Sequence, residues 1–329
     1  MRLFKLRQLQ IFIYSFIFLL SPYPSHAIYG GTSALGNAFV VGLLTDPFAK
    51  SVGCSGALVA PRIVFTAAHC LTMPGENFWV QIPGTNLENT SLARVRGERI
   101  FTPEGFSTNK FPYENDFGIL VLSRDLVPSV SISIATSTQI SEWIKSGSSV
   151  THVGYGCTAL VDAPPCGKTS PVPYEFETQL QSQIPPQFSS LTPNSFTMSK
   201  ISVEKTICGG DSGSPLLKKS GNSWFYIGAQ SSSNGAGCTK TCDVLCVATQ
   251  GLASFNNSLV NEAFVYAGSK TPNQSTTSSE SSIKPEPAAK PSAVASPVLK
   301  KITITCVKGK LTKKVTGANP KCPTGYTKK

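Results

Sequence analysis

Short runs of β-branched and aromatic residues recur from residue 28 to about residue 268, separated by clusters of Gly, Pro, Asn and Ser. Examples are AFVVGLL, FWVQI, FGILVL, SVTHVGYG and SWFYIGAQ. Runs of this length between turn-forming residues are typical of antiparallel strands, whereas parallel βαβ units need helical segments between their strands. The spacing therefore predicts an all-β barrel or sandwich, with ample length for a buried core.

The region ends on a different pattern. In NSLVNEAFVYAG, residues 257–268, the apolar positions follow a helical spacing and Gly268 closes the segment. This pattern predicts a short amphipathic helix at the end of the domain.

Beyond this helix we expect two further parts. Residues 269–299 are rich in Ser, Thr, Pro, Lys and Glu and contain no aromatic residue, which predicts a disordered linker. Residues 300–329 then alternate, turn at Lys308-Gly309-Lys310 and alternate again, which predicts a small β-hairpin module. Cys306 and Cys322 could close it with a disulfide.

The first 27 residues have the pattern of a signal peptide. Three basic residues precede an apolar run from Leu9 to Leu20, and Ser25-x-Ala27 offers a signal-peptidase site. An uncleaved membrane anchor is the alternative, but the apolar run is short for a bilayer span. We therefore expect cleavage after Ala27 and a secreted protein.

The ten cysteines fit export, because an even number in an oxidising compartment favours disulfides. A zinc site is the competing interpretation. The chain after residue 27 has only two histidines, and the Cys242-x-x-x-Cys246 pair lacks a second matching pair. We expect neither a metal nor another cofactor.

The net charge of +11 is unevenly distributed. Residues 270–329 hold twelve lysines and two glutamates, hence +10, and the signal peptide contributes three basic residues, which leaves −2 for residues 28–269. An anionic cell wall or membrane surface is therefore a candidate partner of the tail, with a solubilising role as the alternative. We expect no nucleic-acid partner.

Three separated segments carry residues suited to catalysis. FTAAHC contains His69, ENDFGILVL contains Asp116 and CGGDSGSPL contains Ser212. A serine hydroxyl is a weak nucleophile at neutral pH and needs a neutral imidazole to take its proton. His69 is the best candidate, since His26 leaves with the signal peptide and His152 is the only other histidine.

In combination and in this order, these segments resemble the chymotrypsin/trypsin family of serine endopeptidases. IYGG stands where the family's mature N-terminus lies, Cys54 and Cys70 bracket the stretch before the histidine, and VGYG provides the expected Gly-aromatic-Gly segment. The resemblance covers residues 28–268 and implies two six-stranded antiparallel β-barrels with a C-terminal helix. The C-terminal segment is similar to Cys-bracketed, Lys-rich modules that end a number of exported bacterial proteins.

The resemblance also implies roles for the site residues. Ser212 would be the nucleophile, His69 the general base, and Asp116 the carboxylate that fixes the imidazole tautomer. The backbone N–H groups of Gly210 and Ser212 would form the oxyanion hole.

Activation follows from the same resemblance. In the family, the residue matching Asp211 is buried and pairs with the α-ammonium of the mature N-terminus, here Ile28. Signal-peptidase cleavage after Ala27 would release that amine directly, so no zymogen stage would be needed.

The family positions further imply two disulfides, Cys54–Cys70 and Cys208–Cys238. Four other cysteines have no clear counterparts and allow three connectivities, among which we prefer the local pairs Cys157–Cys166 and Cys242–Cys246.

The substrate pocket departs from the trypsin pattern. Thr206 stands six residues before Ser212, where trypsin-like members carry an Asp that binds Lys or Arg. Either Asp243 or Cys246 could reach the pocket wall. We expect cleavage after apolar or small polar residues.

The sequence therefore predicts a monomeric secreted serine endopeptidase acting on protein or peptide substrates. The alternative is a catalytically weak or inactive protease-fold protein that acts in surface binding. Because Ser212 and His69 are both present, the enzyme is favoured.

Overall fold

The computed structural model describes residues 28–72, 77–130, 132–157, 169–234 and 246–269, together with residues 302–308, 311–317, 322 and 326–328 near the C-terminus. The chain divides into two compact units, Met1–Thr276 and Thr277–Lys329. The predicted signal peptide, and the predicted linker apart from Ser269, lie outside the described residues. None of the described helices is long and apolar enough to cross a bilayer.

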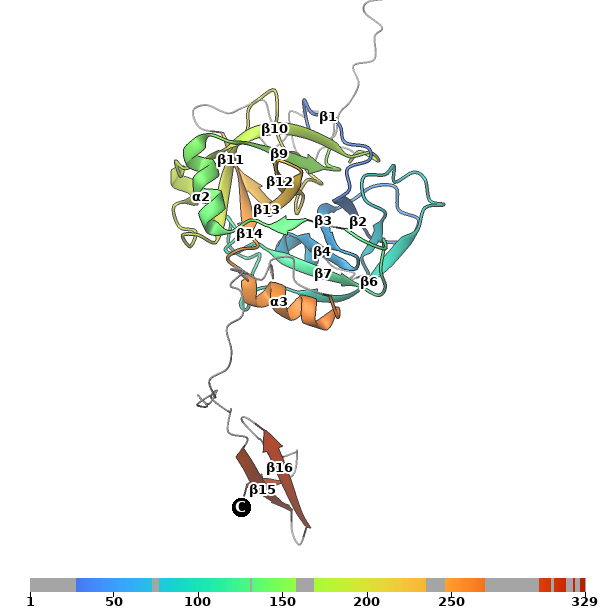
Figure 1. The fold of residues 1–329 in the computed structure, drawn as a ribbon, viewed down its shortest axis with the longest axis vertical. Coiled ribbons are helices and arrows are strands. Elements are labelled where there is room, and N and C mark those ends of the chain that lie inside the picture. Colours follow the sequence, from blue (N-terminus) through green and yellow to red (C-terminus); the bar gives the residue numbers. More distant parts are fainter. Residues whose placement is uncertain are drawn as a thin grey trace, which may run out of the picture. The chain divides into compact units, whose positions relative to one another are not determined.

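Six antiparallel strands form a first closed barrel (Figure 1). Their order around the barrel is β2 (Val40–Leu44), β3 (Cys54–Ala60), β4 (Ile63–Thr66), β7 (Gly118–Leu122), β6 (Arg94–Phe101) and β5 (Trp79–Gln81). Every residue of β2, β3, β4 and β7 is buried. Their apolar runs are continuous rather than alternating because neither face of these strands is left to solvent.

A second barrel follows in the chain. Its strands are β9 (Ser149–Gly154), β10 (Tyr174–Gln181), β11 (Phe196–Lys200), β14 (Val247–Leu252), β13 (Ser223–Ser233) and β12 (Pro215–Ser220), and β12 pairs with β9 to close it. Two short strands add to it, with β1 (Thr32–Ser33) on β10 and β8 (Ser133–Ile134) parallel to β13. The predicted pair of six-stranded barrels is confirmed.

Two α-helices in the described part of the chain flank the barrels. Helix α3 (Asn257–Tyr266) confirms the predicted C-terminal helix. Helix α2 (Ser137–Ser146) is not anticipated by the strand pattern, although it carries its own signals. Thr136 and Gln139 form a reciprocal capping box at its start, and Gly147 ends it with a φ of 60°.

Aromatic packing joins the first barrel to its neighbours. The Phe65 ring of β4 makes edge contacts with Phe117 at 5.1 Å, with Tyr226 of β13 at 5.2 Å and with Phe264 of α3 at 6.4 Å between centroids. All four rings are fully buried. Phe65 thus fixes the end of β4, the strand that leads to the predicted base His69.

The C-terminal unit contains β15 (Ile302–Lys308) and β16 (Leu311–Gly317), which pair antiparallel in the register that joins Lys308 to Leu311. A short strand β17 (Thr327–Lys328) pairs with the other edge of β15. The strands lie where the alternating pattern predicts a hairpin.

Candidate active site

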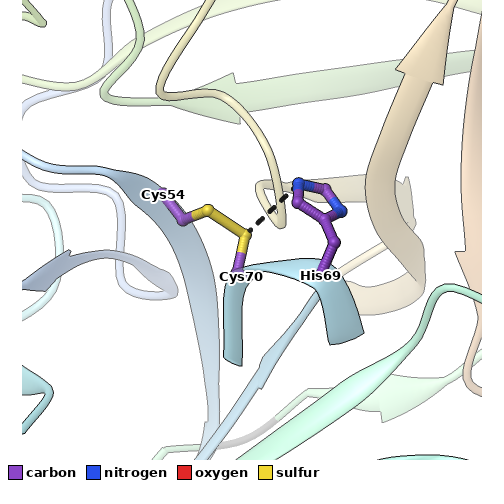
Figure 2. Close-up of side chains that lie close together, drawn as sticks. All are labelled: Cys54, His69 and Cys70. Carbon is purple, nitrogen blue, oxygen red and sulfur yellow. Dashed lines mark hydrogen bonds between the residues drawn. A yellow bond between two sulfur atoms is a disulfide. The ribbon is translucent and has the colours of Figure 1, made fainter. Parts of the chain in front are cut away.

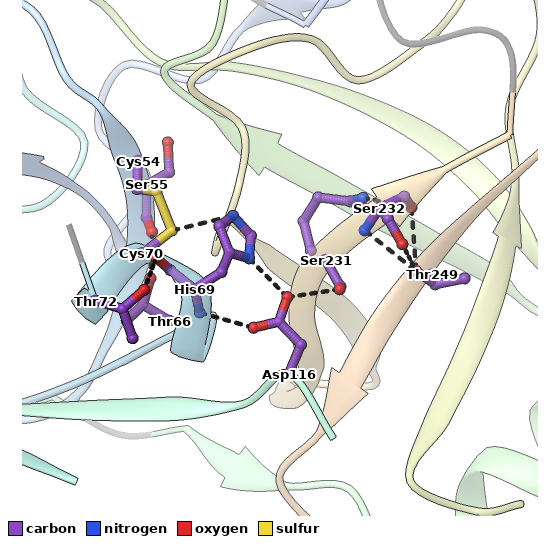
Figure 3. A network of polar contacts seen from close by, with 11 residues as sticks. Cys54, Ser55, Thr66, His69, Cys70, Thr72, Asp116, Ser231, Ser232 and Thr249 are labelled. Atoms are coloured by element: carbon purple, nitrogen blue, oxygen red, sulfur yellow. Dashed lines mark hydrogen bonds and ion pairs between the residues drawn. A yellow bond between two sulfur atoms is a disulfide. The ribbon is translucent and has the colours of Figure 1, made fainter. Parts of the chain in front are cut away.

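His69 and Asp116 meet at adjacent ends of two paired strands. His69 lies in the 3-10 turn η1 (Ala68–Thr72) just after β4, and Asp116 lies just before β7. Because β4 pairs with β7 in the register Thr66 to Gly118, the two residues face each other. His69 Nδ1 lies 2.6 Å from Asp116 Oδ2, and the His69 backbone N–H donates to Oδ1 at 2.9 Å (Figure 3).

This arrangement has a chemical consequence. A carboxylate can only accept, so the imidazole carries its proton on Nδ1 when neutral. Nε2 is then left with a free lone pair, as a general base requires. Asp116 is only 2% exposed, which keeps the interaction away from water.

Ser231 of β13 completes the surroundings of this carboxylate. Its hydroxyl donates to Asp116 Oδ2 at 2.6 Å (Figure 3). The next residue, Ser232, bonds instead to Thr249 at 2.8 Å. Sequence reasoning did not identify Ser231, because residues 231–233 are all serine and only the strand alternation distinguishes them.

Ser212 lies on a turn held from both sides by backbone hydrogen bonds. The Ser55 N–H donates to the Ser212 carbonyl at 2.8 Å, and the Gly213 N–H donates to the Gln230 carbonyl at 2.7 Å. Ser55 follows Cys54, whose disulfide partner adjoins His69, and Gln230 precedes Ser231. The turn is therefore hydrogen-bonded to Ser55, next to the disulfide beside His69, and to Gln230, next to the residue that bonds Asp116.

Among the described hydrogen bonds, none joins Ser212 to His69. His69 Nε2 lies 3.7 Å from Cys70 Sγ (Figure 2). Catalytic hydrogen bonds are often long without substrate and shorten in the complex.

Cys54, His69 and Cys70 present three potential metal ligands within 4.8 Å of one another (Figure 2). However, Cys54 and Cys70 form the disulfide that the family resemblance implies. Metals bind the thiolate form of cysteine, which a disulfide does not offer. The disulfide instead ties the His69 turn to the start of β3.

The predicted oxyanion donors lie on the Ser212 turn. Gly210 has a φ of +92°, and a β-carbon there would come within 2.5 Å of the Thr169 side chain. Glycine is therefore required at this position. Within the described residues, neither the Gly210 N–H nor the Ser212 N–H has a hydrogen-bond acceptor. Both amides remain available to an anionic oxygen.

Asp211 is fully buried between these two residues. Its Oδ1 accepts from the Gly156 N–H and its Oδ2 from the Cys208 N–H, each at 2.8 Å. Burial raises the pKa of Asp211 to about 7, while the hydrogen bonds from Cys208 and Gly156 act in the opposite direction. A β-carbon on Gly154 or Gly156 would come within about 2.2 Å of the carboxylate oxygens, so both glycines make room for it.

The predicted mature N-terminus lies in the same region. Ile28 is fully buried in a cluster with Phe176 and Ile207. Tyr29 accepts from the Thr206 N–H at 3.2 Å and packs against Cys208, whose amide bonds Asp211. Since Ile28 follows Ala27 in this chain, its nitrogen is a peptide amide, and the ion pair with Asp211 stays a prediction.

The substrate pocket is described only in part. Thr206 is fully buried, and its hydroxyl donates to the Ile207 carbonyl at 3.2 Å. Asp243 and Cys238 lie outside the described residues, so the pocket wall and the Cys208–Cys238 disulfide stay predictions. Cys157, Cys246 and Cys322 are disulfide-bonded, and their predicted pairings, including Cys306–Cys322, are likewise untested.

An aromatic cluster beside the predicted base, His69, was also missed by sequence reasoning. The Tyr113 ring lies 5.0 Å from the His69 ring at an angle of 33°. Phe106 and Phe111 contact Tyr113 edge-on. No short motif marks this cluster, because it is assembled by a loop of ordinary composition.

The known proteins that this chain resembles are serine proteases. The trypsin family model matches residues 28–251, and the chain belongs to this family. CLIP domain-containing serine protease B4 from Anopheles gambiae is 24% identical over 197 residues, which cover 54% of each chain. The solved structure of the secreted serine protease VesC from Vibrio cholerae shares the fold, with a TM-score of 0.53 and 20% identity over 70% of this chain and 47% of that chain. The chain thus spans about half the length of each relative.

The raised pKa of Asp211 predicts how the uncleaved chain responds to pH. Between the ordinary pKa of 3.8 and about 7, the carboxyl ionises in the unfolded chain but stays protonated in the folded one. The free energy of unfolding should therefore fall as pH rises through this window, and the loss should be complete above it. Urea denaturation of the full-length chain at several pH values measures this slope.

The matched control is Asp211→Asn. Buried His152, whose pKa is lowered to about 3 by desolvation, titrates with the opposite sign in an overlapping window and is present in both proteins. The difference between the two pH profiles therefore isolates Asp211. Parallel profiles from pH 4 to 8 would contradict the prediction.

Proposed function

We propose that this chain is a secreted serine endopeptidase that hydrolyses peptide bonds through Ser212, His69 and Asp116. The observation that carries the proposal is the His69–Asp116 hydrogen bond at 2.6 Å, beside a turn whose Gly210 and Ser212 amides have no acceptor among the described residues. The trypsin family match and the two serine-protease relatives support the same function.

The reaction would proceed through an acyl-enzyme. Ser212 Oγ attacks the peptide carbonyl carbon while its proton passes to His69 Nε2, and Asp116 stabilises the resulting imidazolium. The Gly210 and Ser212 amides bind the oxyanion of the tetrahedral intermediate. The intermediate then expels the amine, which takes the proton from Nε2. A water molecule, deprotonated by His69, releases the acid and restores Ser212.

The test is hydrolysis of a peptide library. Ser212→Ala should lower kcat about a million-fold, because the nucleophile and base act as one unit. Asp116→Asn should lower it about 10⁴-fold through the wrong imidazole tautomer. Labelling with a fluorophosphonate, which needs an activated serine, should disappear in the Ser212→Ala protein. A folded wild-type protein that neither hydrolyses nor labels would favour the non-catalytic alternative.

The same library addresses the substrate pocket. Thr206 offers a neutral hydroxyl at the proposed pocket floor, where an unpaired lysine or arginine side chain would be costly to bury. Cleavage is expected after apolar or small polar residues. A profile dominated by Lys and Arg would overturn this part of the proposal and implicate Asp243.

We further propose that export itself activates the enzyme. Cleavage after Ala27 would turn the buried Ile28 amide into an ammonium that pairs with Asp211. Removing one partner of a buried ion pair typically costs about 3–5 kcal/mol, so without the ammonium the open turn described above is less stable against collapse. A protein beginning with one extra Met before Ile28 should therefore fold but be nearly inactive.

Asp211→Asn should share this defect even when Ile28 is the N-terminus. N-terminal sequencing of the secreted protein identifies the cleavage site, and active-site titration measures the competent fraction. Equal activity of the Met-extended and native proteins would disprove this account of activation.

We propose that the protein is a monomer and that its basic tail, residues 270–329, binds an anionic surface. The tail carries +10 whereas residues 28–269 carry −2. Sedimentation with anionic vesicles and with isolated cell walls should require the tail, and should weaken above about 0.15 M salt, where charges are screened beyond about 8 Å. Equal sedimentation of a chain ending at Gly268 would assign the tail a solubilising role instead.

A further inference from the structure

The second residue of β3 has an unusual set of partners. Ser55 is fully buried, and its hydroxyl donates to the Gly210 carbonyl at 2.8 Å, 155 positions away in the chain. The same hydroxyl accepts from the Tyr155 N–H at 3.0 Å. Because an amide can only donate, the single hydroxyl proton must point at Gly210.

We propose that Ser55 is a positioning residue that holds the oxyanion hole in its active geometry. This inference rests on the proposed function. It concerns how the Gly210 and Ser212 amides are oriented, rather than which residues react.

The geometry of the turn explains why such a residue is needed. Gly210 has a φ of +92°, a conformation that glycine adopts with unusual freedom, so the peptide planes around it can rotate at low cost. The carbonyl of Gly210 and the N–H of Asp211 belong to one peptide plane. Ser55 holds the carbonyl, and the Cys208 carbonyl accepts from the Asp211 N–H at 3.0 Å. This plane is thereby fixed at both ends.

Ser55 also bonds the residue that carries the second proposed donor. Its backbone N–H bonds the Ser212 carbonyl at 2.8 Å, while its own carbonyl accepts from the Thr66 hydroxyl at 2.8 Å. Thr66 ends β4, three residues before His69. Ser55 therefore bonds the turn at Gly210 and at Ser212, and it also bonds β4, the strand that leads to the proposed base. Among the described side chains, only that of Ser55 bonds the Gly210 carbonyl.

The test is Ser55→Ala in the activated protein, residues 28–329. The variant leaves the Gly210 carbonyl and the Tyr155 N–H without this partner, so the turn can rotate away from its active position. Misplaced donors cost transition-state stabilisation, and we expect kcat to fall about 10- to 100-fold with KM nearly unchanged. A peptide aldehyde forms a tetrahedral adduct with an oxygen in the oxyanion hole, so its affinity should weaken by a similar factor.

Ser199→Ala is the matched control. Ser199 is equally buried, and its hydroxyl is bonded to His152 and Gln250 in the second barrel rather than to the turn. Thermal unfolding is followed for both variants. Ser199→Ala should lose comparable stability while keeping the kcat and aldehyde affinity of the wild-type protein.

Three results would overturn the proposal: unchanged kcat and aldehyde affinity in folded Ser55→Ala, an effect on KM alone, or equal losses in both variants that track their unfolding temperatures. Each of these three results requires that the wild-type protein is active, so none of them contradicts the proposed function. An inactive wild-type protein would instead refute the proposed function, and this inference with it.

Discussion

The seam between the two barrels, where the Ser212 turn docks on β3, is the contact on which the candidate site depends. His69 and Asp116 come from the first barrel, whereas Ser212 comes from the second, so no single barrel contains the site. Gly213 allows the close approach. Its φ is +76°, and a β-carbon there would come within 2.0 Å of the Thr66 hydroxyl and 2.5 Å of the Ser55 carbonyl. Any side chain at this position would push the turn off β3.

Two buried carboxylates, those of Asp116 and Asp211, lie on either side of this seam. They differ in the chemical type of their hydrogen-bond donors. Asp116 faces the imidazole, the His69 amide and the Ser231 hydroxyl, and thus has a partner that becomes cationic on protonation. Asp211 has two backbone amides, which stay neutral, and burial raises its pKa to about 7. Among the described residues, no cationic group pairs with Asp211 in the uncleaved chain, and such a charge is what an incoming ammonium would supply.

Much of this architecture follows from the sequence, and the exceptions have physical reasons. His69, Asp116 and Ser212 lie in short segments whose residue types suit the chemistry. The strand runs predict an all-β barrel or sandwich, and the family resemblance implies the two barrels. Helix α2 was missed because its capping box, Thr136 with Gln139, lies in a Ser/Thr-rich stretch typical of a loop. Ser55 resembles any small strand residue, since its role depends on contacts a hundred or more positions away. Contacts of that range leave no local pattern.

The conformation of Ile28 links this architecture to export. In the uncleaved chain its φ is +51°, which is unfavourable for a β-branched residue by about 1–3 kcal/mol. That dihedral angle is defined by the carbonyl carbon of Ala27, so cleavage after Ala27 abolishes it and the steric conflict it creates. The same cut produces the ammonium proposed to pair with Asp211. In the uncleaved chain the Tyr29 carbonyl already accepts from the Thr206 N–H, beside Ile207 of the cluster that buries Ile28. Relief of strain and pairing of charge would then favour the same rearrangement, because both would arise from breaking the one bond at which we propose signal-peptidase cleavage.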